Sequence, residues 1–424
     1  MDVAVIAGII MIISVVVMLV MGVPIGISIG MSSALAMITI LPFGPGIVTC
    51  AQKMFTGVNS FSLLAIPFFI LAGNIMNNGG IAIRLVNCAR LISGRLPGSL
   101  AQTNIVANML FGAISGTMAP IELEEGYDKD YVAAVNIASA PTGQLIPPSN
   151  TLIVYATVAG SVSVAALFMA GYIPGIAWGI SLMFIAGYMA KKRGYVSTFS
   201  VTPKEALKVL WDALPSLLLI IIVIGGILKG VFTATEGSAI AVVYALILSL
   251  CYRSLKIKDL PSIILSSCKT TCIVIFMIGV SSIMSWVMAY TMIPTAIANA
   301  MLSLSSNKYV ILLLMNVILL VVGTFMDPTP AVLIFTPIFL PICQSFGMDP
   351  VQFGIMIVFN LCIGTITPPV GVILFTGCKV VGISIEGVIK TLLPFFAAIA
   401  VVLLLVTYVP AMSMWIPSML GLVK

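Results

Sequence analysis

The chain has no histidine, few charged residues and no C-x-x-C motif among its eight cysteines. Of its 424 residues, 8% are charged and 61% are hydrophobic, whereas soluble proteins carry about 25% charged residues. Without histidine, histidine-ligated haem, Ser-His-Asp catalysis and zinc hydrolysis are excluded. Cys268 and Cys272 share a helix face, which favours packing over metal binding. The composition therefore predicts a polytopic membrane protein without a separate soluble domain.

Long apolar runs divide the chain. Runs of about 20 residues can span a bilayer, and ten lie near 3–21, 23–42, 61–78, 131–160, 165–190, 213–231, 235–252, 266–290, 350–378 and 387–409. The first follows Asp2 without a basic segment, so we expect a retained span and not a cleaved signal. Two further regions, 98–121 and 308–345, are interrupted by Gly, Pro, Ser or Thr. We interpret both as re-entrant helical hairpins, with kinked helices as the alternative.

The basic residues predict an orientation. With the N-terminus outside and two re-entrant hairpins, fifteen Lys and Arg residues fall inside. Four fall outside: Lys53, Lys229, Lys308 and Lys424. This bias obeys the positive-inside rule and places both termini outside. The net charge of +6 is thus an orientation signal, and no nucleic-acid partner is expected.

Two Pro-Pro pairs interrupt apolar runs, in GQLIPPSN at 143–150 and GTITPPVG at 364–371. Proline has no N–H, so the carbonyls four residues earlier lose their helical partners. These carbonyls belong to Gly143, Gln144, Gly364 and Thr365. In a bilayer, broken backbone survives only where it lines a cavity or binds something. We therefore expect two broken transmembrane helices that form two half-sites for a cation and a substrate.

An internal repeat pairs the two breaks. One constant shift along the chain places Gly126 on Gly347, Asp128 on Asp349 and the first Pro-Pro pair on the second. By the predicted orientation, one hairpin enters from inside and the other from outside, so the repeats are inverted. Inverted repeats are typical of secondary transporters, which bind substrate at the repeat interface near the midplane.

The first hairpin is shorter than the second. The interval from Gly112 to Gly126 falls well short of the corresponding interval from Gly323 to Gly347. About ten residues are therefore missing from the first hairpin relative to the second, just after Gly116. Part of the expected tip is therefore absent from the first hairpin, so fewer candidate ligands can be named there than in the second hairpin.

The hairpin tips and the breaks concentrate oxygen donors. Such donors suit a hard cation such as Na⁺, and restarting helices offer N–H groups to an anion. Two or more Na⁺ sites are predicted, from Ser115, Gly116, Gly143, Gln144, Pro147, Gly323, Asp327, Thr329, Gly364, Thr365 and Pro368. The predicted substrate-binding residues are Ser115, Thr117, Ser149, Asn150, Thr324 and Thr367. Each hydroxyl could instead bond a carbonyl of its own helix, but the paired arrangement favours binding.

Acidic residues are few. Asp327 is the only carboxylate in either tip, and we predict that it binds the cation and does not cap a helix. Glu236 is predicted to start a helix, with a partner contact or a gating role as the alternative. Glu122, Glu124 and Glu125 are expected to be solvated at the cytoplasmic mouth.

The predicted organisation has six parts. They are scaffold helices of the first repeat (1–78), an interfacial amphipathic arm helix (79–97), the first transport half (98–190), a cytoplasmic linker with scaffold helices of the second repeat (191–290), a second arm (291–307), and the second transport half with the last span (308–424).

Several short motifs carry a resemblance to one known family. They are FGAISG at 111–116, GYD at 126–128, IPPS at 146–149, ALFMAG at 166–171, GVFTATEG at 230–237, TPIFLP at 336–341 and GTITPPVG at 364–371. Over essentially its whole length, the chain resembles the large membrane subunit, DctM-like or M, of tripartite ATP-independent periplasmic (TRAP) transporters. Members usually have a longer stretch rich in Ser, Ala and Gly after the motif that ends at Gly116.

The resemblance implies an all-α, inverted-repeat fold of the ion-transporter superfamily that works as a Na⁺-driven elevator in the bacterial inner membrane, with periplasmic termini. It implies import of an organic acid such as a sialic acid, a C4-dicarboxylate or a sugar acid. The implied partners are a small four-helix membrane subunit (Q-type), a periplasmic substrate-binding protein (P-type) and membrane lipid. A stand-alone Na⁺/carboxylate symporter and a channel are the alternatives. An enzyme is least favoured, because no nucleophile–base pair is visible.

Overall fold

The computed structural model describes residues 3–111, 118–160, 162–195, 201–304, 307–369 and 371–423. Within these ranges every regular element is a helix. Eight helical segments are long and apolar enough to cross a membrane: Phe61–Asn78, Val164–Arg193, Pro203–Leu228, Ala234–Cys251, Ile257–Tyr290, Lys308–Phe325, Pro328–Ser345 and Ile385–Tyr408. The predicted class of all-α polytopic membrane protein is confirmed.

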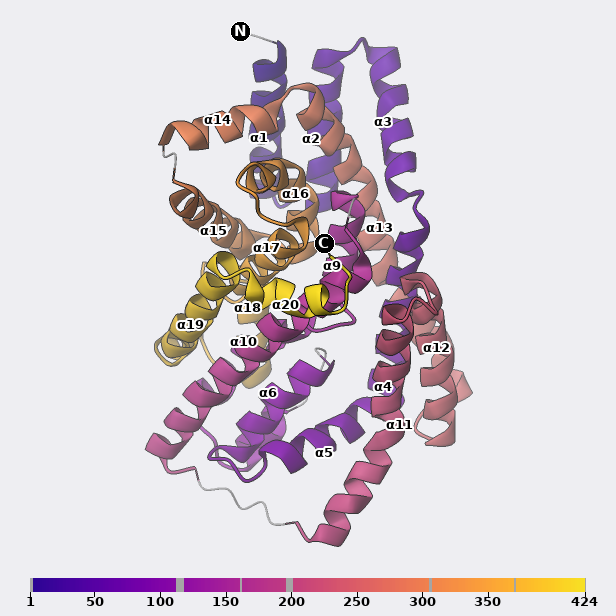
Figure 1. The fold of residues 1–424 in the computed structure, drawn as a ribbon, viewed down its shortest axis with the longest axis vertical. Helices are drawn as coiled ribbons and strands as arrows, with labels where there is room; N and C mark the ends of the chain where they lie inside the picture. Colours follow the sequence, from indigo (N-terminus) through magenta and orange to yellow (C-terminus); the bar gives the residue numbers. More distant parts are fainter. Residues whose placement is uncertain are drawn as a thin grey trace.

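Helices from both repeats form one packed group. The first repeat supplies α1 (Val3–Val20), α2 (Ile25–Ile40), α3 (Phe43–Val58), the short η1 (Phe61–Leu64) and α4 (Ala65–Asn78), and the second supplies α11 (Pro203–Leu228), α12 (Ala234–Cys251), η3 (Ile257–Asp259) and α13 (Leu260–Tyr290). α4 packs against α12, and α13 packs against α2 and α3 (Figure 1). The residues of α3 were not predicted as an element, because Pro45, Gln52 and Lys53 weaken the apolar run.

The remaining helices contain both breaks. The first set is α5 (Ile81–Ser93), α6 (Ser99–Phe111), α7 (Ala119–Glu124), α8 (Lys129–Ser139), η2 (Ala140–Gln144), α9 (Asn150–Ala159) and α10 (Val164–Arg193). The second is α14 (Ile293–Leu304), α15 (Lys308–Phe325), α16 (Pro328–Ser345), α17 (Pro350–Gly364), α18 (Val372–Val381), α19 (Ile385–Tyr408) and α20 (Ala411–Met419). The helices stop and restart at both Pro-Pro pairs, as predicted, and both Pro-Pro peptide bonds are cis.

Element boundaries reproduce the internal repeat. The starts of α8, α9 and α10 (129, 150, 164) keep an almost constant offset from the starts of α17, α18 and α19 (350, 372, 385). The earlier pairs α2/α12, α5/α14 and α6/α15 (25/234, 81/293, 99/308) keep a smaller offset. The offset thus changes within the first hairpin, which agrees with a first hairpin shorter than the second.

Corresponding elements lie at opposite ends of the molecule. In Figure 1, α14 and α15 lie in the upper part, whereas α5 and α6 lie in the lower part. This is the arrangement that inverted repeats predict. α15 and α16 are 18 residues each and are joined by two residues. Because that length also suffices for a full span, the re-entrant character of this hairpin stays a prediction.

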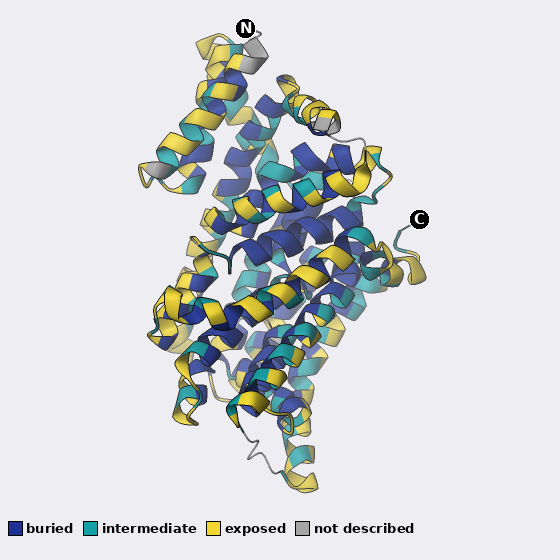
Figure 2. Cartoon of the chain, turned by 90° about the vertical axis from the view of Figure 1, so that its left-hand side faces the viewer, coloured by how far each residue is buried: buried dark blue, intermediate teal, exposed yellow. Residues whose placement is uncertain are grey.

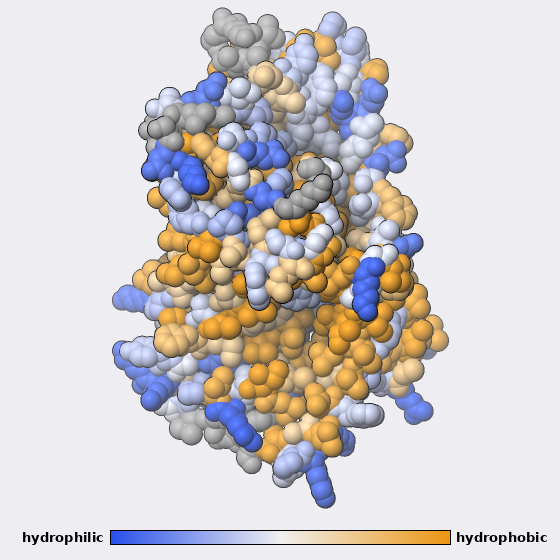
Figure 3. Space-filling model, viewed as in Figure 1, coloured by the Kyte–Doolittle hydropathy of each residue, from blue (hydrophilic) through white to orange (hydrophobic). Residues whose placement is uncertain are grey.

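The broken helices occupy the centre of the fold. Every residue of α8 from Tyr131 to Ser139 is buried, and so is every residue of α17 from Val351 to Gly364. Figure 2 shows the buried residues gathered on inner helices, with exposed residues on the outer ones. Large apolar side chains such as Phe184 and Trp211 face outward, and Figure 3 shows a continuous hydrophobic surface across the middle of one face. A bilayer or a membrane partner would cover such a surface.

Candidate functional site

The tip of the second hairpin and the second break touch through two glycines. Gly323 lies near the C-terminus of α15, and Gly364 ends α17. A Cβ added to Gly364 would lie 2.4 Å from the Cα and carbonyl carbon of Gly323. Only two glycines allow this backbone contact. The structure therefore brings together two predicted Na⁺ ligands that lie far apart in the sequence.

A backbone hydrogen bond fixes the same contact. The Gly371 N–H donates to the Thr324 carbonyl at 2.9 Å. The Gly364 carbonyl accepts from Thr367 N–H at 3.0 Å, and the Thr365 carbonyl accepts from Ile373 N–H at 3.0 Å. The expectation that these two carbonyls lack partners is wrong, because the turn supplies other donors. A carbonyl has a second lone pair, so both oxygens keep capacity for a cation.

The threonine hydroxyls of this half-site bond carbonyls of their own helices. Thr324 Oγ1 donates to Val321 O, Thr365 Oγ1 to Cys362 O and Thr367 Oγ1 to Ile363 O, each at 2.7 Å. This is the alternative that the sequence left open for single hydroxyls. It uses the proton of each hydroxyl and leaves oxygen lone pairs, which are the atoms that a cation would contact.

Asp327 occupies the N-cap position of α16, yet its side chain makes no capping hydrogen bond. Pro328 and Pro330, which follow it, have no N–H to offer. The residue is exposed, Thr329 beside it is half-buried, and Pro368 at the break is half-buried. The carboxylate is therefore not engaged in capping, which leaves the predicted role in cation binding open.

The first break is closed by Ser149. Its hydroxyl donates to the Gln144 carbonyl and accepts from Leu152 N–H (3.3 Å), so it caps α9. The Gln144 carbonyl, expected to be without a partner, thus has one. The structure shows Ser149 holding the break together and does not test its predicted contact with substrate.

The two breaks are neighbours in space. Cys362, two residues before Gly364, donates from its Sγ to the Gln144 side-chain Oε1 at 3.2 Å. Nearby, a Cβ on Gly171 would lie 2.2 Å from the Leu145 carbonyl oxygen, so α10 also passes close to the first break. The predicted half-sites therefore form one region at the centre of the molecule.

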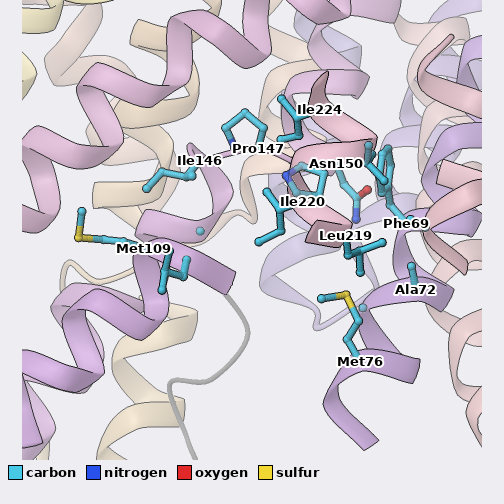
Figure 4. A pocket seen from close by; sticks show the side chains of 16 residues that line it. Phe69, Ala72, Met76, Met109, Ile146, Pro147, Asn150, Leu219, Ile220 and Ile224 are labelled. Carbon is cyan, nitrogen blue, oxygen red and sulfur yellow. The ribbon is translucent and has the colours of Figure 1, made fainter. Parts of the chain in front are cut away.

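A cavity of about 120 Å³ opens beside the first break. Gly143, Pro147 and Asn150 line it from the break, Met109 from α6, and residues of α4 and α11 form the opposite wall (Figure 4). Asn150 Oδ1 is buried and has no hydrogen-bond partner. An unpaired buried amide oxygen next to a cavity is a candidate contact for a ligand or water, which fits the predicted role of Asn150.

Three predicted ligands are not tested. Ser115, Gly116 and Thr117 lie outside the described residues. The first half-site is therefore known only from its break, whereas both sides of the second half-site are described.

Two predictions about acidic residues have clear outcomes. Glu236 starts α12 in a capping box with Thr233: Glu236 N–H donates to Thr233 Oγ1 (3.2 Å), and Thr233 N–H donates to Glu236 Oε2 (2.8 Å). The helix-start interpretation is confirmed. Glu122, expected to be solvated, is 0% exposed, so that expectation is wrong.

The network around Glu122 was not predicted from the sequence. Asn104 and Asn136 donate their side-chain amides to Oε1 (3.3 Å) and Oε2 (2.8 Å) of Glu122. Asn104 and Asn108, four residues apart in the first predicted hairpin, were the available signal, since polar side chains at this spacing share a helix face.

A repeated order of helices, with two broken helices that meet at the centre, is typical of one class of membrane transporter. A family model of the tripartite ATP-independent periplasmic transporter, DctM component, matches residues 12–412. The chain belongs to this family, so it is a transporter permease and not an enzyme.

Relatives extend over nearly the whole chain. A Salmonella typhimurium protein, YgiK, described as uncharacterized, is 52% identical over 92% of this chain and 92% of its own length. The isethionate TRAP transporter permease DctMQ of Oleidesulfovibrio alaskensis is 41% identical over 90% of this chain and 62% of its own. The sialic acid TRAP transporter large permease SiaM of Vibrio cholerae is 36% identical over 91% and 93%.

The fold also resembles a solved structure. The YdaH transporter of Alcanivorax borkumensis superimposes with a TM-score of 0.64 at 14% identity, over 86% of this chain and 88% of that one. At this identity the likeness shows the fold alone.

Proposed function

We propose that this chain imports a small organic acid across the bacterial inner membrane, driven by Na⁺, with a small membrane subunit and a periplasmic binding protein as partners. The observation that carries the proposal is the backbone contact of Gly323 with Gly364, which joins oxygen donors of the second hairpin and the second break. Carbonyl oxygens, hydroxyl oxygens and the carboxylate of Asp327, which makes no capping hydrogen bond, are the kind of donors that bind a hard cation.

The substrate is an organic anion of the sialic acid, C4-dicarboxylate, sugar acid or sulfonate class. Support comes from relatives whose names state sialic acid, C4-dicarboxylate and isethionate. Asn150, with its unpaired Oδ1, lines the cavity. This oxygen can accept a hydrogen bond from a donor group of the substrate or from a water, while the periplasmic partner sets much of the selectivity.

The proposal includes a movement that carries the substrate across the membrane. The helices that carry the breaks would move as a unit past the scaffold formed by α1–α4 and α11–α13. The cavity supports this division, because its two walls come from these two parts (Figure 4).

Uptake into proteoliposomes tests the function. The chain is reconstituted with the small subunit and the binding protein encoded beside it, and labelled acids are offered with and without an inward Na⁺ gradient. We expect saturable uptake that requires both the gradient and the binding protein. Saturable uptake without the binding protein would support a stand-alone symporter, and unsaturable Na⁺-independent flux would support a channel.

A further inference from the structure

Among the residues that the structure describes, Glu122 is a buried carboxyl group that forms no ion pair. It lies on the short helix α7, is 0% exposed and contacts the amides of Asn104 on α6 and Asn136 on α8. The ion pairs of the described ranges join Arg193 to Asp128 and Asp130, and neither includes Glu122. A buried charge without a counter-charge is costly, and such a group lowers that cost by taking up a proton.

The surrounding network is short of hydrogen-bond donors. Asn108 Nδ2 donates to Asn104 Oδ1 (3.1 Å) and to Ser139 Oγ (2.8 Å), and Asn136 Nδ2 also donates to Val132 O (2.8 Å). The side-chain oxygens of Asn108 and Asn136 are buried without a partner. A carboxylate adds only acceptors, whereas a protonated carboxyl adds one O–H donor. One proton on Glu122 therefore supplies the kind of group that the network lacks.

The second repeat shows that the fold does not require an acid at this place. The shift that pairs Gly126 with Gly347 pairs Glu122 with Cys343, and the shift that pairs Gly112 with Gly323 pairs Asn104 with Met315. Cys343 Sγ lies 3.7 Å from Met315 Sδ, in the contact that corresponds to Glu122 with Asn104. One half thus has two apolar sulfur groups where the other has a carboxyl and an amide.

Among the described residues, Glu122 is the only buried acid. α6 contributes no acid or base among its residues. On α8, Asp130 is bound to Arg193, Lys129 is exposed, and buried Tyr131 donates its O–H to Ala186 O. α18 packs against α7, and its Lys379 is exposed. Burial raises the pKa of Tyr127, which therefore stays neutral.

Water can approach this region. Tyr127, whose N–H donates to the Glu122 carbonyl at 3.1 Å, lines a cavity of about 190 Å³ together with Glu125 and Arg90. Such a volume holds several waters.

Burial raises the pKa of the Glu122 carboxyl to about 7, while the two amide donors act in the opposite direction.

We propose that Glu122 is a proton-binding site in the first transport half, separate from the predicted Na⁺ sites, and that its protonation tightens the packing of α6 against α8. One proton adds to a carboxylate oxygen, and the new O–H donates to an amide oxygen of the network. No other bond changes. The proton site does not depend on the proposed transport function, so the test uses purified protein in detergent.

The test combines infrared spectroscopy with thermal unfolding between pH 5 and pH 8 (about the range between the ordinary and the raised pKa of the group). We expect the carbonyl stretch of a protonated carboxylic acid to be lost as pH rises through neutrality in wild type and to be absent in Glu122→Gln. Because a raised pKa in the folded state favours the folded state at low pH, the Tm of wild type should fall as pH rises. Glu122→Gln, which resembles the protonated form, should lose this part of the pH dependence.

Two further variants keep the result interpretable. Glu124→Gln changes an exposed acid on the same helix and should behave as wild type. If Glu122→Gln does not fold, Asn104→Met with Glu122→Cys copies the sulfur pair of the other half and should fold without the pH response. The proposal is overturned if Glu122 remains a carboxylate at pH 5, if the Glu122 variants keep the full pH response, or if the Glu122 band follows Na⁺ and not pH.

Discussion

At the scale of single residues, Gly323 and Gly364 pack backbone against backbone between the hairpin and the break. A side chain on either residue meets backbone, which cannot rotate away. In the sequence, these two glycines were visible only as repeated positions, Gly323 in the hairpin and Gly364 at the break. That the two glycines touch each other depends on how α15 crosses α17, which no local pattern encodes.

Gly364→Ala should therefore destabilise the protein and abolish uptake. Overpacking of a tight contact costs about 1–3 kcal/mol, and here the added Cβ would lie 2.4 Å from backbone atoms. Thermal unfolding in detergent and uptake assays measure both effects. Gly225→Ala is the control, because a Cβ there meets nothing within 4 Å. Equal behaviour of the two variants would show that the Gly323 contact is not required.

Asp327→Asn should weaken the Na⁺ dependence of transport and leave the fold intact. Its side chain makes no cap for α16, so the loss of charge would remove the proposed cation ligand and not a structural bond. We expect a Na⁺ concentration for half-maximal uptake that rises about tenfold or more, equivalent to about 1.4 kcal/mol. Asp212→Asn, an exposed acid on α11, is the control. An unchanged Na⁺ response would refute the assignment.

At the scale of elements, each break is a helix end followed by a new helix, and the sequence predicted both correctly. Two consecutive prolines cannot continue a helix, so this outcome depends only on local chemistry. What the sequence did not predict is that Ser149, Thr367 and Ile373 provide donors to the freed carbonyls. Those donors come from the geometry of the turn, which depends on packing against the other half.

Ser149→Ala should destabilise more than an ordinary loss of an N-cap. Loss of the cap costs about 1 kcal/mol. The half-buried Gln144 carbonyl also loses its donor, which adds part of the about 1–3 kcal/mol that a fully buried group would lose. Ser384→Ala is the matched control, since Ser384 caps α19 through Gly387 N–H (3.3 Å) alone. Thermal unfolding compares the two variants, and equal losses would contradict the role given to Ser149.

A bidentate ion pair joins the N-terminus of α8 to the C-terminus of α10, and its contribution to stability depends on pH. Arg193 donates to both oxygens of Asp130 at 2.8 and 2.6 Å, and this pair lowers the pKa of Asp130 to about 2. A lowered pKa contributes stability above the ordinary value, which is lost as pH falls from about 4 to about 2.

Asp130→Asn should accordingly lower the free energy of unfolding by about 1–2 kcal/mol at neutral pH. The difference in this free energy between the variant and wild type should shrink as pH falls from about 4 to about 2. The pH dependence of unfolding in detergent measures it. Asp128→Asn, whose side chain is 61% exposed, should cost about 0–1 kcal/mol. A difference between Asp130→Asn and wild type that does not depend on pH would contradict the ion-pair account.

At the scale of the whole molecule, the two repeats share one order of helices, but their chemistry is not equal. The punctuating Gly and Pro residues were enough to find the repeat and its offset. They could not reveal that Glu122 is buried, because its acidic neighbours Glu124 and Glu125 made the whole segment resemble a solvated turn. The corresponding Cys343 and Met315 show that each half tolerates different residues inside one backbone plan.

The proposed movement predicts which cross-links stop transport. Met76 on α4 and Met109 on α6 line the cavity from its two sides (Figure 4). With the native cysteines replaced, a short bifunctional thiol reagent joining Met76→Cys to Met109→Cys should abolish uptake, because it ties the moving part to the scaffold. The control joins Met54→Cys to Gly279→Cys, where a Cβ on Gly279 lies 3.0 Å from Met54 Cγ within the scaffold. That link should leave uptake intact, since two scaffold helices need not separate. Uptake that survives the cavity link would refute relative movement of these two parts and favour a fixed pathway between them.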